Sequence, residues 1–352
     1  MGMKQKKKFK LPLDQFINFC LYNKNLGYYM NKSSFGKEGD FITAPNISRL
    51  FSEMIAIWII SFWQSLGSPK KFNVVELGAG NGEMMKILIE SFQKFPIFFE
   101  ASNFIIHEKS PSLIKVQKKK LIKTRAKWIS NLNELKKIPS VFVANEFFDS
   151  MVIKQFRKKG SIWFEKFVNF KNPKKPFFYE KMADIKKIER EINFKIFKGQ
   201  DFIEYSKPGF DYLKNISKII KENTGGILLI DYGYTEKKMK NTLQAVSNHK
   251  FANILENIGN VDITHNINFY SFKKFISKMK DLDSILTTQR KFLLELGIEQ
   301  RAEIISKEKP FSKKTDIFYR LNRLINEKQM GNLFKVMFIK NTKNKFKLGF
   351  KN

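Results

Sequence analysis

The sequence has little cysteine and histidine and no long hydrophobic run. Its 352 residues include one cysteine, Cys20, which excludes a disulfide framework and a cysteine-based zinc or iron–sulfur site. Its three histidines, His107, His249 and His265, lie far apart, which argues against a multi-histidine metal site. The most apolar stretch, residues 54–63, is about half as long as the roughly 20 residues of a membrane-spanning helix. We therefore expect a protein that does not span a membrane.

Arginine is scarce beside lysine. The formal net charge is +32 at pH 7, yet only eight of the 65 basic residues are arginine and 57 are lysine. A strongly basic chain suggests a nucleic acid, an anionic membrane surface or an acidic partner. Bidentate recognition of guanine or phosphate, however, favours arginine. Because the chain is also rich in Ile, Asn and Phe, as an AT-rich genome imposes, we attribute most of the charge to background composition.

The N-terminal segment, MGMKQKKKFKLPLDQF, has a basic cluster that no apolar segment of a secretory signal follows. A mitochondrial presequence would be rich in arginine and serine, and this segment is not. We therefore expect a cytoplasmic protein.

The predicted strands and helices alternate along the chain. Strands are expected at residues 72–77, 104–108, 126–130, 141–144 and 226–230, with helices at 83–92, 112–124 and 212–222. Such alternation is typical of a parallel sheet with helices on both faces. Residues 154–202, rich in aromatic residues and lysine, interrupt it and predict an inserted β-hairpin or small subdomain.

The remaining predicted elements flank this core. Helices are expected at 13–26, 50–66, 271–279 and 315–327, and a last strand at 334–339. We expect an α/β fold with a helical N-terminal extension over residues 1–70 that covers the active site. The main domain then spans residues 71–345 and carries the insertion at about 154–202.

A glycine-rich loop joins the first core strand to its helix. Gly78, Gly80 and Gly82 allow a ligand to approach the backbone closely. The dinucleotide fingerprint would need a further glycine where Glu83 stands, and Glu83 repels a pyrophosphate. With Glu76 ahead of the loop, the pattern suits a cationic ligand without phosphate, such as S-adenosylmethionine, and it resembles the first motif of class I methyltransferases. We expect the glycines to line the cofactor and Glu76 to lie near its amino group. The alternative is a structural turn that only lets the helix pack on the sheet.

Two further positions suggest cofactor contacts. Glu108 ends the second core strand, where a carboxylate can bind both hydroxyls of a ribose; its alternative role is a surface salt bridge. Asn131 and Leu132, just past the third strand, are expected to flank the adenine.

Polar residues also follow the fourth and fifth core strands. Ligands of open parallel sheets bind beyond the carboxyl ends of the strands, which places Asn145, Glu146 and Tyr232 beside the expected cofactor. An amide and a carboxylate there could hold a substrate amine or guanidinium, and Tyr232 could stack on a planar cation. The alternatives are a helix cap, for Asn145 or Asp149, and plain packing for Tyr232.

The motifs, taken in order, resemble one known family. They are Gly39-Asp-Phe-Ile-Thr-Ala-Pro45, Val75-Glu-Leu-Gly-Ala-Gly-Asn-Gly82, Glu108-Lys-Ser-Pro111, Asn145-Glu-Phe-Phe-Asp149, Asp231-Tyr-Gly233, Asp262-Ile-Thr264, Gln289-Arg-Lys-Phe-Leu-Leu-Glu-Leu-Gly-Ile298 and Met330-Gly-Asn-Leu-Phe-Lys-Val-Met337. The set spans nearly the whole chain and is similar to the MidA-like family of S-adenosylmethionine-dependent methyltransferases. This resemblance implies a class I methyltransferase (Rossmann-like) fold: a seven-stranded, mostly parallel sheet with an antiparallel final strand.

The resemblance also implies a function. Mitochondrial members of this family are assembly factors for respiratory complex I and methylate a protein arginine. The implied cofactor is S-adenosylmethionine, and the implied partner is a protein substrate, such as a subunit of a respiratory complex. Because a free arginine side chain is always protonated, carboxylates such as Glu146 and Asp40 suit its recognition. Glu146, Asn145, Asp40 and Tyr232 are our candidates for the substrate side.

The chain departs from the usual family pattern at several positions. Asn46 stands where glutamate is usual, Val152 where proline is, and Asn266 where histidine is; the loop reads Gly-Ala-Gly-Asn-Gly where Gly-Pro-Gly-Arg-Gly is usual. Two alternatives therefore stay open. The net charge of +32 favours a nucleic-acid methyltransferase, although no recognised nucleic-acid-binding module is present. The substitutions leave room for an assembly chaperone that keeps the fold without transferring a methyl group.

Overall fold

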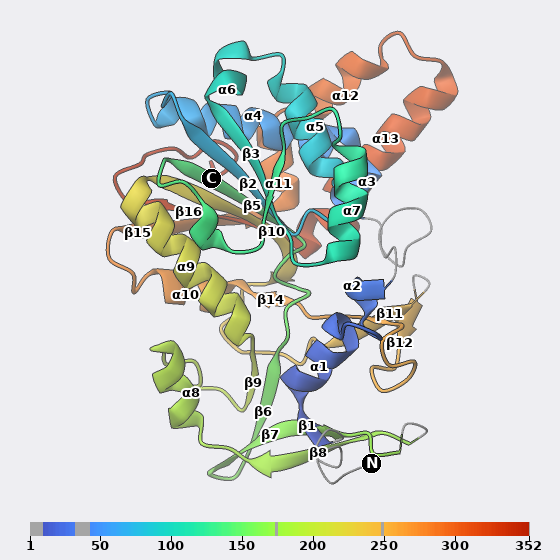
Figure 1. The fold of residues 1–352 in the computed structure, drawn as a ribbon, viewed down its shortest axis with the longest axis vertical. Helices are drawn as coiled ribbons and strands as arrows, with labels where there is room; N and C mark the ends of the chain where they lie inside the picture. Colours follow the sequence, from blue (N-terminus) through green and yellow to red (C-terminus); the bar gives the residue numbers. More distant parts are fainter. Residues whose placement is uncertain (1–9, 32–42, 173–174, 248–249, 352) are drawn as a thin grey trace.

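A computed structural model describes residues 10–31, 43–172, 175–247 and 250–351 (Figure 1). The upper part in Figure 1 is built on one large sheet, and the lower part is a smaller, mainly antiparallel β-structure. In the described part of the chain, no helix is both long and apolar enough to cross a membrane. The same residues contain no group of three or more side chains suited to binding a metal ion.

The large sheet has the strand order β15-β16-β10-β5-β2-β3-β4. Its strands are β2 (Phe72–Leu77), β3 (Ser102–His107), β4 (Lys127–Ile129), β5 (Ser140–Asn145), β10 (Gly225–Tyr234), β15 (Leu282–Thr288) and β16 (Phe334–Asn341). Only β16 runs antiparallel to its neighbours, and the short β14 (Ile267–Asn268) adds to the end of β10 in parallel. The predicted seven-stranded, mostly parallel sheet with an antiparallel final strand is therefore confirmed.

The central strands are buried on both faces, as parallel strands under two helical layers must be. Every residue of β2, β5 and β10 is buried. One face packs against α4 (Arg49–Ser65), α5 (Glu83–Phe92), α6 (Pro96–Ala101), α11 (Gln289–Glu295), α12 (Ile298–Ser306) and α13 (Phe311–Ile325). The other face packs against α9 (Lys207–Asn223) and α10 (Phe269–Ile276). A π-helical turn, η3 (Glu327–Gly331), links α13 to β16.

The helix α4 belongs to this sheet layer, although it lies in the segment that the sequence places in the N-terminal extension. The Ser48 side chain caps it by accepting a hydrogen bond from the amide of Leu50. On its buried face Trp58 packs edge-on against Phe338 of β16, with ring centroids 4.8 Å apart. The part of the extension outside this layer is therefore α1 (Leu13–Tyr22), α2 (Tyr28–Asn31) and α3 (Ala44–Ile47).

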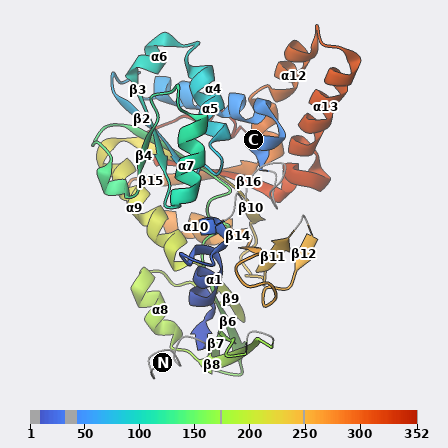
Figure 2. The ribbon, with the colours of Figure 1, turned by 45° about the vertical axis from the view of Figure 1, so that its right-hand side comes forward.

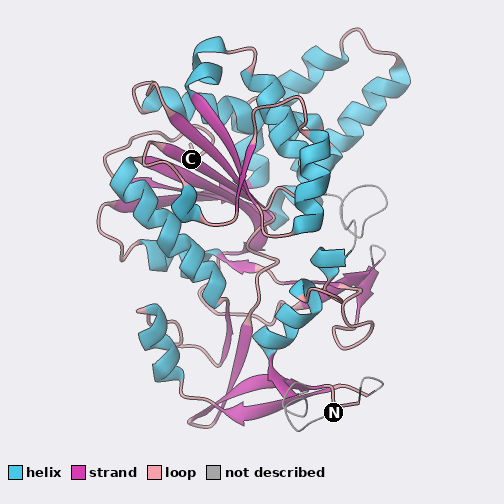
Figure 3. Cartoon of the chain, in the orientation of Figure 1, coloured by secondary structure: helices cyan, strands magenta, loops and turns pink. Residues whose placement is uncertain are grey.

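The inserted segment forms most of the lower part, which we call the cover subdomain (Figure 2). It consists of β6 (Lys154–Lys159), β7 (Ile162–Asn169), β8 (Phe177–Met182), α8 (Ile185–Ile192) and β9 (Phe202–Tyr205), together with β1 (Lys10–Pro12) from the N-terminus. All pairings in this five-stranded sheet are antiparallel. Its strands pair with none of the large sheet, and Figure 3 shows them as a group of arrows below that sheet.

A third, small sheet stands beside α1. It contains β11 (Gln244–Ser247), β12 (Lys250–Ala252) and β13 (Asp262–Thr264). Buried side chains of α1, β7 and β13 share one hydrophobic cluster, so α1 connects the cover subdomain to the small sheet. The predicted helix over residues 13–26 is too long, because α1 ends at Tyr22.

Candidate active site

The glycine loop after β2 adopts a backbone that favours glycine. Gly78, Gly80 and Gly82 have φ angles of +65°, +51° and +78°, in the left-handed region that other residues rarely enter. A Cβ on Gly78 would also lie 2.7 Å from the ring of Phe147. Gly82 then forms the N-cap of α5. The loop therefore presents bare backbone at the carboxyl edge of the sheet.

Glu76 lies directly ahead of this loop. Its side chain is buried, and Oε2 has no hydrogen-bond partner among the described residues. Burial raises the pKa of Glu76 to about 8. A small cavity of about 40 Å³ adjoins Glu76, Gly78 and Gly80. A buried carboxylate oxygen without a partner needs a donor, and a cationic ligand group would supply one.

Glu108 and Gln117 connect β3 and α7 (Pro111–Lys120) to the same loop. Oε1 of Glu108 accepts hydrogen bonds from the amides of Lys109 and Ser110, each at 2.9 Å. The side-chain amide of Gln117 donates to Oε2 of Glu108 at 3.1 Å and to the carbonyl of Gly80 at 2.8 Å. Gln117 thus fixes the Glu108 carboxylate relative to the loop. The sequence analysis missed Gln117, since a single glutamine on a helix matches no motif.

A cavity of about 490 Å³ lies between the carboxyl edge of the large sheet, α1, α2 and the small sheet. At one end it is lined by Gly78, Gly80 and Glu108, and at the other by Glu146, Asp149 and Asp262. Its volume is in the range of small-molecule sites, roughly 300–1,000 Å³. Of the predicted site residues, Gly78, Gly80, Glu108 and Glu146 therefore line this cavity, and Asp149 and Asp262 join them.

Glu146 lies at the acidic end and also lines the small cavity beside the glycine loop. It has a φ of +50°, an unusual conformation for a residue other than glycine. Its Oε1 accepts hydrogen bonds from the amide of Ala44 and from the side chain of Asn145, both at 3.2 Å. Burial, and to a smaller extent the neighbouring Asp149, raises the pKa of Glu146 to about 8. The carboxyl group is therefore poised to ionise when a cation binds beside it.

Two residues of β10, Asp231 and Tyr232, fix the position of Asp149 by hydrogen bonds. The Tyr232 hydroxyl donates to Oδ2 of Asp149 at 2.5 Å, and Oδ1 has no partner among the described residues. Both oxygens of Asp231 accept backbone amides, including those of Phe148 and Asp149 at 3.1 and 3.2 Å. Tyr232 does not itself line the cavity. Its ring packs against Phe334 instead of being open to a ligand, so it acts through Asp149.

Tyr29 and Asp262 complete the acidic end and were not predicted as site residues. The Tyr29 hydroxyl donates to Oδ1 of Asp262 at 2.7 Å. Its backbone carbonyl accepts from Ser110 at 2.8 Å, which ties α2 to the segment that follows Glu108. Asp262 had a sequence signal in the Asp-Ile-Thr motif, but only the fold brings it to this cavity.

Two other predicted residues, Asn131 and Leu132, do not line the cavity. Asn131 is exposed, and its side chain caps the 3₁₀ helix η2 (Leu132–Glu134). Leu132 is buried in the hydrophobic cluster below the sheet. Neither lines the cavity, so the predicted contact with adenine has no support in this geometry. Asp40 lies outside the described residues.

With this geometry established, known proteins provide a comparison. The sequence model of a family described as "Putative S-adenosyl-L-methionine-dependent methyltransferase" matches residues 54–287. The chain belongs to this methyltransferase family. It is an S-adenosylmethionine-dependent methyltransferase, and the predicted enzyme class and cofactor are confirmed.

Individual relatives of this methyltransferase agree with the family. Proteins named "Protein arginine methyltransferase NDUFAF7, mitochondrial" are similar over most of the chain. The Danio rerio protein is 26% identical, covering 94% of this chain and 84% of its own, and the Homo sapiens protein is 26% identical, covering 92% and 78%. A crystal structure of a Burkholderia thailandensis protein bound to S-adenosyl-homocysteine superimposes with a TM-score of 0.79 at 20% identity, covering 99% of this chain and 90% of that one. This likeness shows a shared fold.

The glycine end of the methyltransferase cavity fits S-adenosylmethionine. The unpartnered, buried Oε2 of Glu76 suits an ammonium group. Gly78 and Gly80 line the cavity with bare backbone in the left-handed region. The Glu108 carboxylate, held by three donors, suits the hydroxyls of a ribose. These individual contacts remain predictions.

Two departures from the usual family pattern contact each other in this methyltransferase. The side-chain amide of Asn81, in the glycine loop, donates to Oδ1 of Asn46 at 2.9 Å. Glutamate and arginine are usual at these positions, so an amide pair replaces two groups of opposite charge. Asn46 also donates to the hydroxyl of Thr43 at 2.8 Å, which lines the cavity. The two changes therefore compensate each other, which argues against an inactivated site.

Proposed function

We propose that the chain methylates an arginine side chain of a protein substrate. The observation that carries this proposal is the cluster of carboxyl groups from Glu146, Asp149 and Asp262 at one end of the cavity. A guanidinium is permanently charged and has five donors that match carboxylate oxygens. The buried, unpartnered Oδ1 of Asp149 offers one acceptor to such a guanidinium. The names of the distant relatives point to the same substrate class.

The bound cofactor supplies an electrophilic methyl group on a sulfonium. The residues of the chain position the substrate, since the attacking nitrogen must lie about 3–3.5 Å from the methyl carbon. Glu146 lies at the acidic end, also lines the small cavity beside the glycine loop and would hold the guanidinium there. The nitrogen that takes the methyl group must lose a proton, and Oδ1 of Asp149 would accept it.

The carboxyl groups also discriminate against the nucleic-acid alternative. Phosphates next to a nucleobase acceptor would approach Glu146, Asp149 and Asp262, and like charges repel. The non-catalytic alternative is less favoured, because the glycine loop, Glu76 and Glu108 keep the groups that a cofactor needs. By resemblance, we infer that the protein substrate is a subunit of a respiratory complex. The cytoplasmic location stays the expectation of the sequence analysis.

The test uses an extract of cells that lack the gene, incubated with the purified enzyme and tritiated S-adenosylmethionine. We expect acid-stable label in protein, released on hydrolysis as methylarginine. Label in nucleic acid, or in another amino acid, would contradict the arginine assignment. Cofactor binding measured by calorimetry without any transfer would favour the chaperone alternative.

A further inference from the structure

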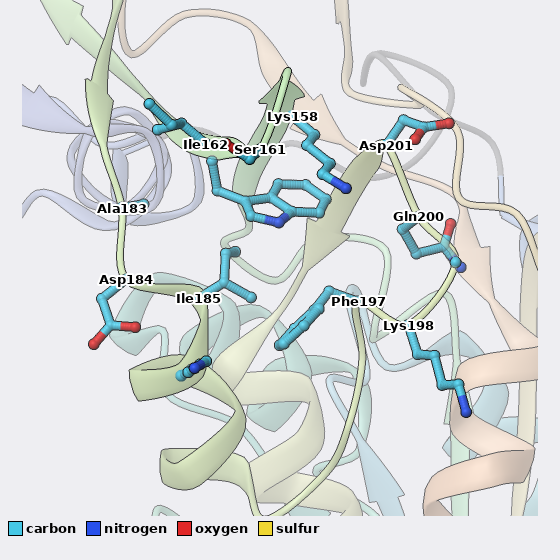
Figure 4. A pocket seen from close by; sticks show the side chains of 13 residues that line it. Lys158, Ser161, Ile162, Ala183, Asp184, Ile185, Phe197, Lys198, Gln200 and Asp201 are labelled. Atoms are coloured by element: carbon cyan, nitrogen blue, oxygen red, sulfur yellow. The ribbon is translucent and has the colours of Figure 1, made fainter.

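A second hollow, of about 840 Å³, lies in the cover subdomain (Figure 4). It is formed by the turn between β6 and β7, the start of α8 and the loop before β9. We call it the outer groove. None of its lining residues lines the catalytic cavity. The groove is therefore a separate feature that methyl transfer does not explain.

The inner part of the outer groove is apolar. Trp163 of β7 and Phe197 of the loop meet edge-on, with ring centroids 6.4 Å apart. Ile185 is buried beneath them, and Ile162 stays 44% exposed at the side. Figure 4 shows the side chains of Ile185 and Phe197 directed into the same space. Half-buried aromatic rings around an open space are typical of a pocket that accepts one bulky side chain.

The rim of the outer groove is positive. Lys158, Lys186 and Lys198 are exposed, and none of them is in a salt bridge with a carboxylate of the described residues. The two acidic rim residues already face other cations. Asp184 lies 3.7 Å from Arg190, and Asp201 lies 3.1 Å from Lys238. The charge left for a ligand is therefore that of three lysines.

We propose that the outer groove binds an acidic segment of a partner protein, with one bulky apolar side chain seated between Trp163 and Phe197. The three lysines complement the acidic residues on either side of this anchor. A segment bound here would hold its protein on the cover subdomain. The inference goes beyond the proposed function and does not require the bound protein to be methylated.

The lining favours a peptide over a single-stranded nucleic acid. Nucleic-acid grooves stack successive bases on aromatic faces along a track of positive charge. Here the two rings meet edge-on and are enclosed by Ile162 and Ile185, and no arginine lines the groove. One enclosed apolar pocket with a mixed rim matches a side-chain anchor better.

The test is a direct binding measurement on the full-length chain by fluorescence anisotropy. The probe is a fluorescein-labelled pentapeptide with a central tryptophan between two pairs of glutamates. We expect micromolar binding that weakens at least about 10-fold in Trp163→Ala, and equally in the double variant Lys158→Glu/Lys198→Glu. Lys187→Glu, an exposed lysine of α8 outside the groove, is the matched control and should change affinity less than about 2-fold.

Replacing the central tryptophan of the probe by glycine should weaken binding by about 10-fold as well. Unchanged affinity for S-adenosylmethionine in each variant shows that the fold persists. The proposal is overturned if the chain does not bind the probe, or if Trp163→Ala binds it as tightly as the native chain. It is also overturned if a ten-nucleotide oligothymidylate binds the groove more tightly than the peptide.

Discussion

The Tyr232 hydroxyl donates a 2.5 Å hydrogen bond to Oδ2 of Asp149, across the carboxyl ends of two neighbouring strands. This bond fixes the carboxylate and leaves Oδ1 buried without a partner among the described residues. A buried acceptor of this kind is costly unless a ligand supplies a donor. The pair therefore prepares one oxygen for the methyl acceptor, with Tyr232 as a positioning residue.

Tyr232→Phe should shift the pH dependence of transfer. Burial raises the pKa of Asp149, and the Tyr232 hydrogen bond lowers it. Without that bond the pKa rises further, so the acidic limb of the kcat/KM profile should move up by about 0.5–1 pH unit. Above that limb, kcat/KM should stay within about 3-fold of the native value. Tyr234→Phe, in the same strand and hydrogen-bonded to the amide of Lys240 instead, is the control. An equal loss at every pH would indicate a purely structural role.

Glu146→Gln should spare cofactor binding and reduce methyl transfer by about 100-fold or more. Glutamine can still accept from the amide of Ala44, but it has no charge for a guanidinium. Calorimetry gives the affinity for S-adenosylmethionine, and single-turnover transfer to the labelled protein gives the rate. Glu299→Gln, in the first turn of α12, removes one carboxylate outside the cavity and should change neither. Intact methylation by Glu146→Gln would show that the assigned role is wrong.

The buried carboxyl groups should make the cofactor-free protein less stable as the pH rises. Burial raises the pKa of Glu76 and of Glu146 from 4.5 to about 8 in the folded chain. Between these values the folded chain binds more protons than the unfolded chain, so the free energy of unfolding falls as the pH increases. We expect the melting temperature to drop by at least about 2 °C from pH 5 to pH 8. Glu76→Gln should reduce this slope, and a slope that stays the same would contradict the burial effect.

Local sequence patterns were sufficient to predict the glycine end of the cavity. Gly78 and Glu108 follow adjacent parallel strands, whose carboxyl ends meet at one edge, so their proximity followed from strand order. The Tyr29–Asp262 bond spans 233 positions and depends on how α2 meets the small sheet, which no local pattern encodes. Gln117 has no motif of its own. Strand β15 was missed for a similar reason, because its seven residues gain their strand character from pairing with β16.

The Asn46–Asn81 contact predicts compensating substitutions. Asn46→Glu alone should weaken cofactor binding by about 10-fold, because the new charge lies near Glu76 and Glu83 around the small cavity. Asn81→Arg alone should also weaken it, since the asparagine oxygen accepts the amide of Glu83 at 3.1 Å. The double variant should recover most of the loss. A double-mutant cycle by calorimetry measures the coupling, and strictly additive effects would refute it.

Gly78→Ala should abolish measurable binding of S-adenosylmethionine while leaving a folded protein. The alanine would adopt a φ of +65° and place its Cβ 2.7 Å from Phe147, so either the loop or the ring must move into the cavity. Gly67→Ala is the matched control, with a φ of +81° and no atom within 4 Å of the added Cβ. Both variants carry similar backbone strain, about 1 kcal/mol, and Gly78→Ala adds the close contact with Phe147, so it should lose more stability in thermal unfolding. Only Gly78→Ala should lose the cofactor in calorimetry, because only there does the added methyl group push the loop or the Phe147 ring into the cavity; equal affinities for the two variants would remove the glycine loop from the cofactor site.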